Sequence, residues 1–164
     1  MDFGELITRA SVWLALILYV IAELGRLRWR RGSGHRSWAR TVSSVGLGCY
    51  VIHVVGAFSV FHGWSHTDAY EFTARVTAKF TGWKWGGGLY VNYLFSAVWL
   101  GEVLWWWLKP ENYRTRSTLI DALVRGFFLV MILNGAVVFV SGPQRWIGGI
   151  LVLALLTGFR KRRR

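Results

Sequence analysis

The side chains best able to do chemistry gather in one polar stretch, residues 62–93, between apolar runs. His62 and His66 are four residues apart and would share one face if the preceding helix continued beyond Phe61. Imidazole and carboxylate groups together are suitable ligands for Zn²⁺ and other divalent ions. The stretch therefore predicts a polar pocket that also draws on the neighbouring spans. Its candidate members are His53, His62, His66, Asp68, Glu71, Asn92 and Tyr93.

Two interpretations of these histidines are open. In one, His62 and His66 hold a divalent metal; in the other, they form hydrogen bonds to backbone or water at a membrane surface. HGWSH matches no zinc motif, and Gly63 would loosen a continuing helix. Haem is not expected, because bis-histidine ligation needs two inward-facing histidines and only His53 lies well inside a span. A divalent metal is therefore the one cofactor left open by the sequence.

A second group consists of charged residues inside the apolar runs: Glu23, Glu102, Asp121 and Arg125. An arginine facing lipid costs at least about 2.5 kcal/mol, so Arg125 is expected to face other helices and pair with one of these carboxylates. Glu23 and Glu102 are expected at a matching depth, and Asp121 is one helical turn away. The preferred interpretation is an ion-pair clamp between helices, and the alternative is a path for protons or ions.

Several other kinds of chemistry have no support in the sequence. The single cysteine, Cys49, excludes an intrachain disulfide and a CxxC centre. The glycines at 86–88 are not followed by Lys-Ser/Thr and do not form a phosphate loop. No G-x-S-x-G motif is present. An enzyme is therefore not the expected class.

The elements that must position these residues are membrane helices. The chain is 54% hydrophobic with 11 Trp, and its charges lie mostly between the apolar runs, which is typical of a polytopic membrane protein. We expect an all-α membrane helix bundle in a single domain, 1–164. In the second span, Gly46, Cys49 and His53 share a face that allows close helix packing. The five predicted spans are 8–27, 41–61, 86–108, 119–140 and 143–159, with KPENYRTRS as a loop before the fourth.

Within the polar stretch, residues 68–80 predict a short amphipathic helix on the membrane surface. Asp68 followed by Glu71 has capping-box spacing, with Asp as the first cap residue, and Glu71 lies four residues before Arg75. Gly82 should end this helix. The glycines at 86–88 should let the chain turn tightly against it.

The distribution of basic residues predicts the orientation. Five crossings place fourteen Lys and Arg on one side, including the six Arg of residues 26–40 and the five-residue basic tail, and five on the other. The positive-inside rule then places the N-terminus outside and the C-terminus in the cytoplasm of an inner-membrane protein. The Arg-rich segments are expected to contact anionic lipid head groups, because they flank apolar spans. Nucleic acid is not an expected partner.

The functional expectation is a structural or accessory subunit, or a small-ligand binder, with a polar pocket at its outer face. The alternative is a membrane-embedded metal-dependent enzyme using His62 and His66, or a proton- or ion-coupled transporter using Glu23, Glu102 and Arg125. A second membrane protein or another copy of the chain is an expected partner class.

Overall fold

The computed structural model describes residues 2–29, 37–140 and 142–160, and this part of the chain is helical and contains no strand. The all-helical prediction is therefore confirmed. Two helices end in π-helical turns, η1 (Ala57–Phe61) and η2 (Asn134–Val138). The α-helices are α1 (Phe3–Trp29), α2 (Ser37–Gly56), α3 (His66–Thr81), α4 (Gly88–Leu108), α5 (Pro110–Thr115), α6 (Thr118–Leu133) and α7 (Gln144–Arg160).

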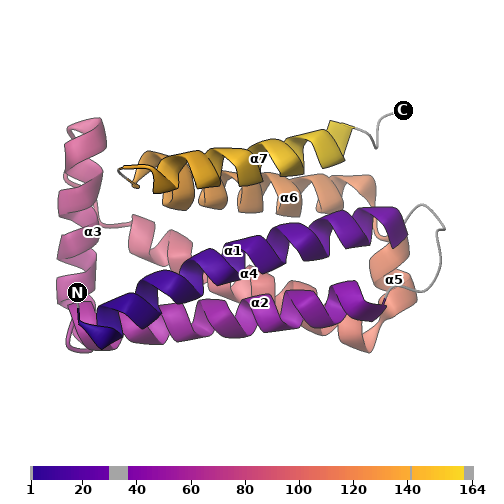
Figure 1. Ribbon diagram of the computed structural model, residues 1–164, viewed down its shortest axis with the longest axis horizontal. Coiled ribbons are helices and arrows are strands. Elements are labelled where there is room, and N and C mark those ends of the chain that lie inside the picture. Colours follow the sequence, from indigo (N-terminus) through magenta and orange to yellow (C-terminus); the bar gives the residue numbers. More distant parts are fainter. Residues whose placement is uncertain (1, 30–36, 141, 161–164) are drawn as a thin grey trace.

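The long helices α1, α2, α4, α6 and α7 run lengthwise through the molecule (Figure 1). Helix α3 lies across one end, and α5 lies at the other. Three of the described helices are long and apolar enough to cross a membrane: Phe3–Leu27, Trp38–Phe61 and Thr118–Val138. The count of five crossings stays a prediction.

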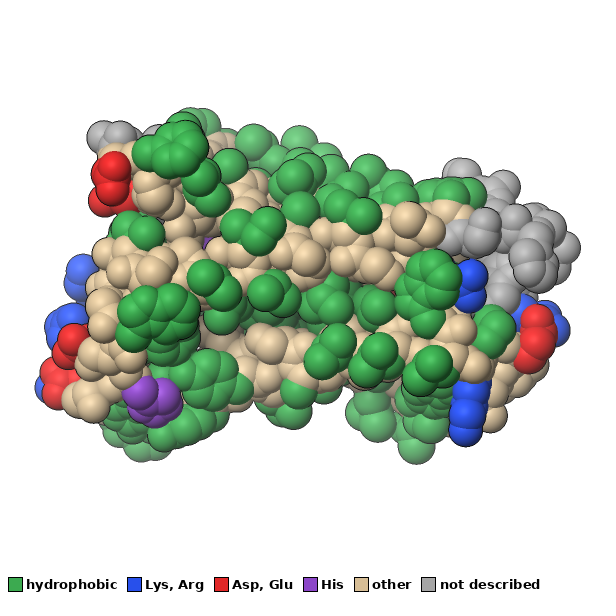
Figure 2. Space-filling model, turned by 90° about the horizontal axis from the view of Figure 1, so that it is seen from below, with side chains coloured by type: hydrophobic (Ala, Val, Ile, Leu, Met, Phe, Trp, Pro, Cys, Tyr) green, Lys and Arg blue, Asp and Glu red, His purple; other side chains and the backbone are tan. Residues whose placement is uncertain are grey.

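The outer surface along the helices is apolar. Figure 2 shows hydrophobic side chains along the length of one face and charged side chains at its two ends. Leu123, Ile150 and Leu153 each leave more than 60% of the side chain exposed. A water-facing surface rarely carries so continuous an apolar area, whereas lipid tails cover it without cost.

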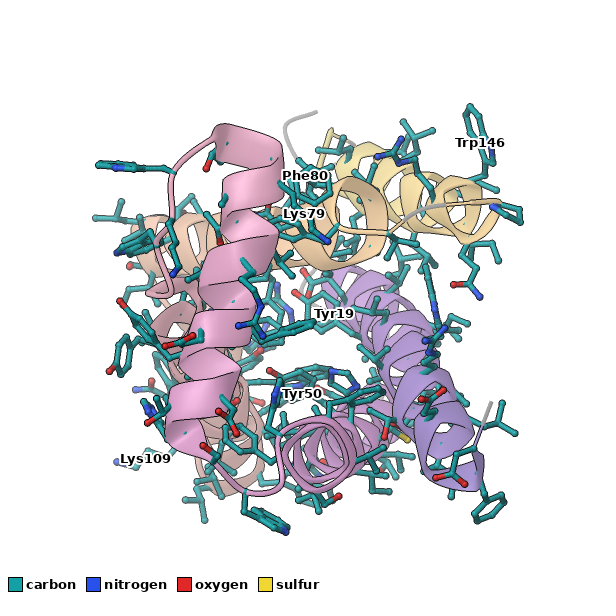
Figure 3. The ribbon with its side chains drawn as sticks, turned by 90° about the vertical axis from the view of Figure 1, so that its left-hand side faces the viewer. Tyr19, Tyr50, Lys79, Phe80, Lys109 and Trp146 are labelled. Carbon is teal, nitrogen blue, oxygen red and sulfur yellow. The ribbon has the colours of Figure 1, made fainter. Side chains whose placement is uncertain are left out.

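The centre of the bundle is aromatic. Tyr19, Trp99 and Phe128 are buried in one cluster, with Tyr19 stacked on Phe128 at 4.6 Å between ring centres. In the end-on view, Tyr19 and Tyr50 point into the space between the long helices (Figure 3). Gly46 permits this packing, because an added Cβ would lie 3.3 Å from the side chains of both Leu18 and Trp99.

Helix α3 is delimited by local signals at both ends. The Ser65 hydroxyl accepts a hydrogen bond from the Asp68 backbone N–H at 3.1 Å, so Ser65 is the N-cap and the predicted Asp68 cap is wrong. The helix therefore begins at His66, two residues before the predicted start. Gly82 ends it in the left-handed conformation, φ 76°, as predicted, and its N–H donates to the Ala78 carbonyl.

The loop predicted between the third and fourth spans contains helix α5, which is a correction. Pro110 stops α4 but also occupies the first turn of α5, where its missing N–H costs nothing. Glu111 lies in the same turn, where its charge is favourable. This short helix turns the chain and brings the buried Tyr113 back toward α4.

Candidate functional site

At the α5 end of the bundle, a buried cluster joins three guanidinium groups to three carboxylates. Helices α1 and α6 each supply one acid and one arginine, α4 supplies the third acid, and the turn between α5 and α6 supplies the third arginine. The charges of these six groups cancel. The members are Glu23 and Arg26, Asp121 and Arg125, Glu102, and Arg116.

Asp121 is the centre of the cluster and is fully buried. Its Oδ1 accepts from Arg26 Nη1 at 2.9 Å and from Arg116 Nη2 at 2.9 Å. Its Oδ2 lies 3.1 Å from Arg125 Nη1. A single carboxylate thus contacts arginines from two other segments and from its own helix.

Glu23 completes a closed ring of ion pairs. It accepts two hydrogen bonds of 2.6 Å from Arg26, three residues along α1, and one of 2.8 Å from Arg125 Nε on α6. Charges therefore alternate around Asp121, Arg26, Glu23 and Arg125. Because charge-assisted hydrogen bonds to planar guanidinium groups are strongly directional, the ring fixes the register of α1 against α6.

An arm extends from this ring toward α4 and α5. Arg116 Nη1 donates to Glu102 Oε1 at 2.5 Å, and the Tyr113 hydroxyl donates to Glu102 Oε2 at 2.8 Å. The Arg116 guanidinium also lies 4.4 Å from the Tyr113 ring centre. Burial raises the pKa of the Tyr113 phenol well above its ordinary value, so this group remains a hydrogen-bond donor.

These contacts refine the sequence interpretation. Arg125 is buried and pairs with Glu23 and Asp121, whereas Glu102 pairs with Arg116. Arg26 and Arg116 were expected among the lipid-facing and loop residues, which is wrong for both, since their side chains are almost fully buried. Glu23 and Arg26 are one turn apart near a helix end, and this spacing could have revealed that Arg26 forms a buried ion pair.

A narrow cavity of about 20 Å³ lies beside the cluster, room for about one water molecule. Tyr19, Ser43, Trp99 and Glu102 are among its lining residues. The buried indole N–H of Trp99 has no hydrogen-bond acceptor within the described residues. The space thus fits a guest about the size of water, and the Trp99 N–H is a donor that such a guest could accept from.

At the opposite end, an open groove of about 350 Å³ lies between α3 and the start of α4. Its lining combines aromatic rings with groups of both charges. The residues are His66, Thr67, Tyr70, Glu71, Ala74, Lys84 and Tyr90. Of these, only His66 and Glu71 belong to the pocket predicted from the sequence.

The glycines before α4 shape this groove. A Cβ on Gly86 would lie 2.5 Å from the backbone carbonyl oxygen of Tyr70, and one on Gly88 would lie 3.1 Å from the Thr73 methyl group. Such contacts exclude a larger residue at Gly86 unless the backbone shifts. These glycines thus let the chain approach α3 closely, as the sequence predicted.

The predicted histidine pair does not share a helical face. The chain turns between the two residues, where Gly63 and Trp64 both have positive φ, 51° and 64°. His62 consequently packs against the rings of Phe58 and Phe72, with centroid distances of 5.9 and 5.3 Å. The helix ends at Phe61 with η1, where the second span was predicted to end, so the condition for a shared face is not met.

The other predicted pocket residues lie in different surroundings. His53 is inside the bundle, where its Nδ1 lies 2.8 Å from the Thr8 carbonyl oxygen. Tyr93 contacts the His66 ring at 6.0 Å between centres. Asp68 and Asn92 are exposed and do not line the groove. The predicted residues are thus divided between the groove, its margin, the exposed surface and the bundle interior.

Within the described part of the chain, no three His, Cys, Asp or Glu side chains come together as a metal site would require. A metal held by His62 and His66 stays a prediction of the sequence. Tyr70, Lys84 and Tyr90 were missed by sequence reasoning, because nothing in their spacing connects α3 with α4 before the glycine turn is seen.

Comparison with known proteins identifies no relative: no protein family, curated protein or solved structure gives a significant match to this chain.

Proposed function

We propose that this protein is a small inner-membrane protein that binds a small ligand in the groove between α3 and α4. The observation that supports binding is the groove itself, an open space of about 350 Å³ with both charges and aromatic rings on its walls. Ligand sites commonly have this size and combine apolar surface with a few polar groups.

The proposed topology is the one expected from the sequence, with five crossings, the N-terminus and α3 outside, and α5 on the cytoplasmic side. The lengthwise arrangement of α1, α2, α4, α6 and α7 supports five crossings (Figure 1). Lys109 and Arg114, at the α5 end, support contact with anionic lipid. A test is labelling of single cysteines at Thr67 and Asn112 in a Cys49→Ser background. An impermeant reagent that labels both positions in intact cells contradicts the proposed topology.

The binding function is tested by filling the groove. Thr67 is exposed and lines the groove, so Thr67→Phe should obstruct it while leaving the core intact. Lys79→Phe, on the same helix but outside the groove, is the matched control.

The measurement is the thermal unfolding of purified protein with neutral, cationic, anionic and zwitterionic small molecules. At least one class should raise the Tm of the wild type and of Lys79→Phe but not of Thr67→Phe. A screen in which no class raises the wild-type Tm, or in which all three proteins respond equally, contradicts the proposal.

The proton- or ion-coupled alternative has one observation in its favour, the small cavity beside Glu102. Against it, each carboxylate of the cluster already pairs with at least one guanidinium, so its charge is balanced within the protein without a passing ion. Proton uptake by liposomes containing wild-type protein, lost in Glu102→Gln, would support transport over ligand binding.

A further inference from the structure

The groove between α3 and α4 carries side chains that suit one kind of ligand charge. Two tyrosines and a histidine line it, with one carboxylate and one ammonium group. We propose that the groove binds a zwitterion, whose organic ammonium group contacts the rings and Glu71 and whose phosphate or carboxylate group pairs with Lys84. This inference rests on the binding function proposed above and names its ligand class.

The aromatic part of the groove suits a cation. The ring centres of Tyr70 and Tyr90 are 6.2 Å apart at an interplanar angle of 57°, and His66 is 5.8 Å from Tyr90 at 43°. The rings are tilted rather than stacked, so they do not cover one another's faces. A cation near such faces is attracted by the ring electrons, and organic ammonium ligands are commonly recognised in this way.

Glu71 and Lys84 are the charged side chains that line the groove. Glu71 is 57% exposed and lies 3.6 Å from Arg75, a surface pair that contributes little and leaves the carboxylate open to a second cation. Lys84 is exposed in the segment between Thr81 and Gly88 and forms no ion pair within the described residues. A purely cationic ligand would leave Lys84 without a counter-charge, and a purely anionic ligand would use neither the rings nor the open side of Glu71, whereas a zwitterion engages all of these groups.

A zwitterion of this kind could be a lipid head group or a free solute. The groove lies where α3 crosses the end of the bundle, which places it at the level of head groups if the long helices cross the membrane (Figure 1). A phosphatidylcholine or phosphatidylethanolamine head group therefore has the required charges, and so does a free solute such as phosphocholine or glycine betaine.

The test uses the full-length protein in phosphatidylglycerol nanodiscs, titrated by calorimetry with phosphocholine, choline and inorganic phosphate. Phosphocholine should bind most tightly, and choline and phosphate should each bind at least about tenfold more weakly, since each makes only part of the contacts. Phosphocholine that binds no more tightly than either part overturns the proposal.

Single substitutions identify the side chains that bind phosphocholine. Tyr90→Leu should weaken phosphocholine binding by roughly three- to tenfold, while Tyr90→Phe, which keeps the ring, should retain it. Lys84→Gln should reduce phosphocholine affinity to about that of choline, and the matched Lys79→Gln should leave it unchanged. Tyr90 and Lys84 are exposed, so these variants should keep the fold, which size-exclusion chromatography checks. Equal loss in Tyr90→Leu and Tyr90→Phe contradicts the cation–ring contact and overturns the proposal.

Repeating the titration in phosphatidylcholine nanodiscs separates the two sources. Weaker apparent binding there supports a lipid head group as the occupant, and unchanged binding supports a free solute. If only a neutral or anionic compound binds, and Thr67→Phe abolishes that binding, the zwitterion proposal fails while the binding function stands. If no compound binds in the groove, both fail.

Discussion

Replacing Arg125 by methionine should destabilise the bundle, because two buried carboxylates would each lose an ion-pair partner. Arg125 Nε donates to Glu23 at 2.8 Å, and Nη1 lies 3.1 Å from Asp121 Oδ2. The arginine side chain is only 7% exposed, so water cannot replace these contacts without a change in packing. Methionine keeps an unbranched apolar side chain and removes the charge.

The expected loss follows from these contacts. Two unit charges about 4 Å apart attract by about 4 kcal/mol at an effective dielectric constant of 20, and Arg125 has two such partners. Repulsion from Arg26 and the cost of desolvating the charges cancel part of this attraction. Removing one member of a buried pair typically costs about 3–5 kcal/mol. Glu23 and Asp121 both keep Arg26, so we expect a value near 3 kcal/mol.

Equilibrium unfolding of the purified protein by SDS in mixed micelles, followed by circular dichroism, measures this loss. Adding Glu23→Gln to Arg125→Met should recover about 1–2 kcal/mol, since the two residues are direct partners. Adding Glu102→Gln should recover nothing, because Glu102 pairs with Arg116. The surface control Arg75→Met should change stability by less than about 0.5 kcal/mol.

The reasoning is refuted if Arg125→Met costs no more than Arg75→Met. Equal recovery by the two double variants would show that the neutral total charge of the cluster, and not the specific pairing, determines its stability.

Three further predictions concern single contacts and use the same unfolding assay unless stated. Gly86→Ala should cost about 1–3 kcal/mol, because its Cβ would clash with the Tyr70 carbonyl oxygen; no loss would mean that α3 moves freely. Ser65→Ala should cost about 1 kcal/mol through the lost N-cap, and an unchanged value would contradict that cap. Tyr113→Phe should cost about 1.5–3 kcal/mol, because Glu102 loses a hydrogen bond. The raised pKa of Tyr113 means that the folded state retains a proton that the unfolded chain releases above its ordinary pKa of 10.0, so stability should fall as pH rises above that value. The fall should be smaller in Tyr113→Phe, and an equal pH dependence would contradict this assignment.

The helical class and most helix positions followed from the sequence, because apolar runs and glycine punctuation are local signals. Gly82 and the glycines at 86–88 act where they were expected to act. The missed features are those that depend on three dimensions. Helix α5 is too short for a periodic signal, and the N-cap moved from Asp68 to Ser65 because the two residues compete for the same role three positions apart.

Four of the six members of the charged cluster were predicted, and the other two were missed for a similar reason. Glu23, Asp121 and Arg125 lie inside apolar runs, and burial of a charge there requires partners. Arg26 and Arg116 lie at the edges of such runs among other arginines, where sequence alone does not separate a lipid-facing guanidinium from a buried one. Only the three-dimensional structure distinguishes them, because it places both arginines against Asp121.

The pairing of charges within single helices has a consequence for biogenesis. Glu23 and Arg26 are bonded one turn apart on α1, and Asp121 and Arg125 are bonded one turn apart on α6. In the proposed topology, each segment therefore carries its own counter-ion into the lipid, and α1 does so before α6 has been translated. Neither helix then has to carry an unpaired charge into the hydrocarbon. The ion pairs between α1 and α6 form afterwards, when the two internally paired helices meet and exchange partners.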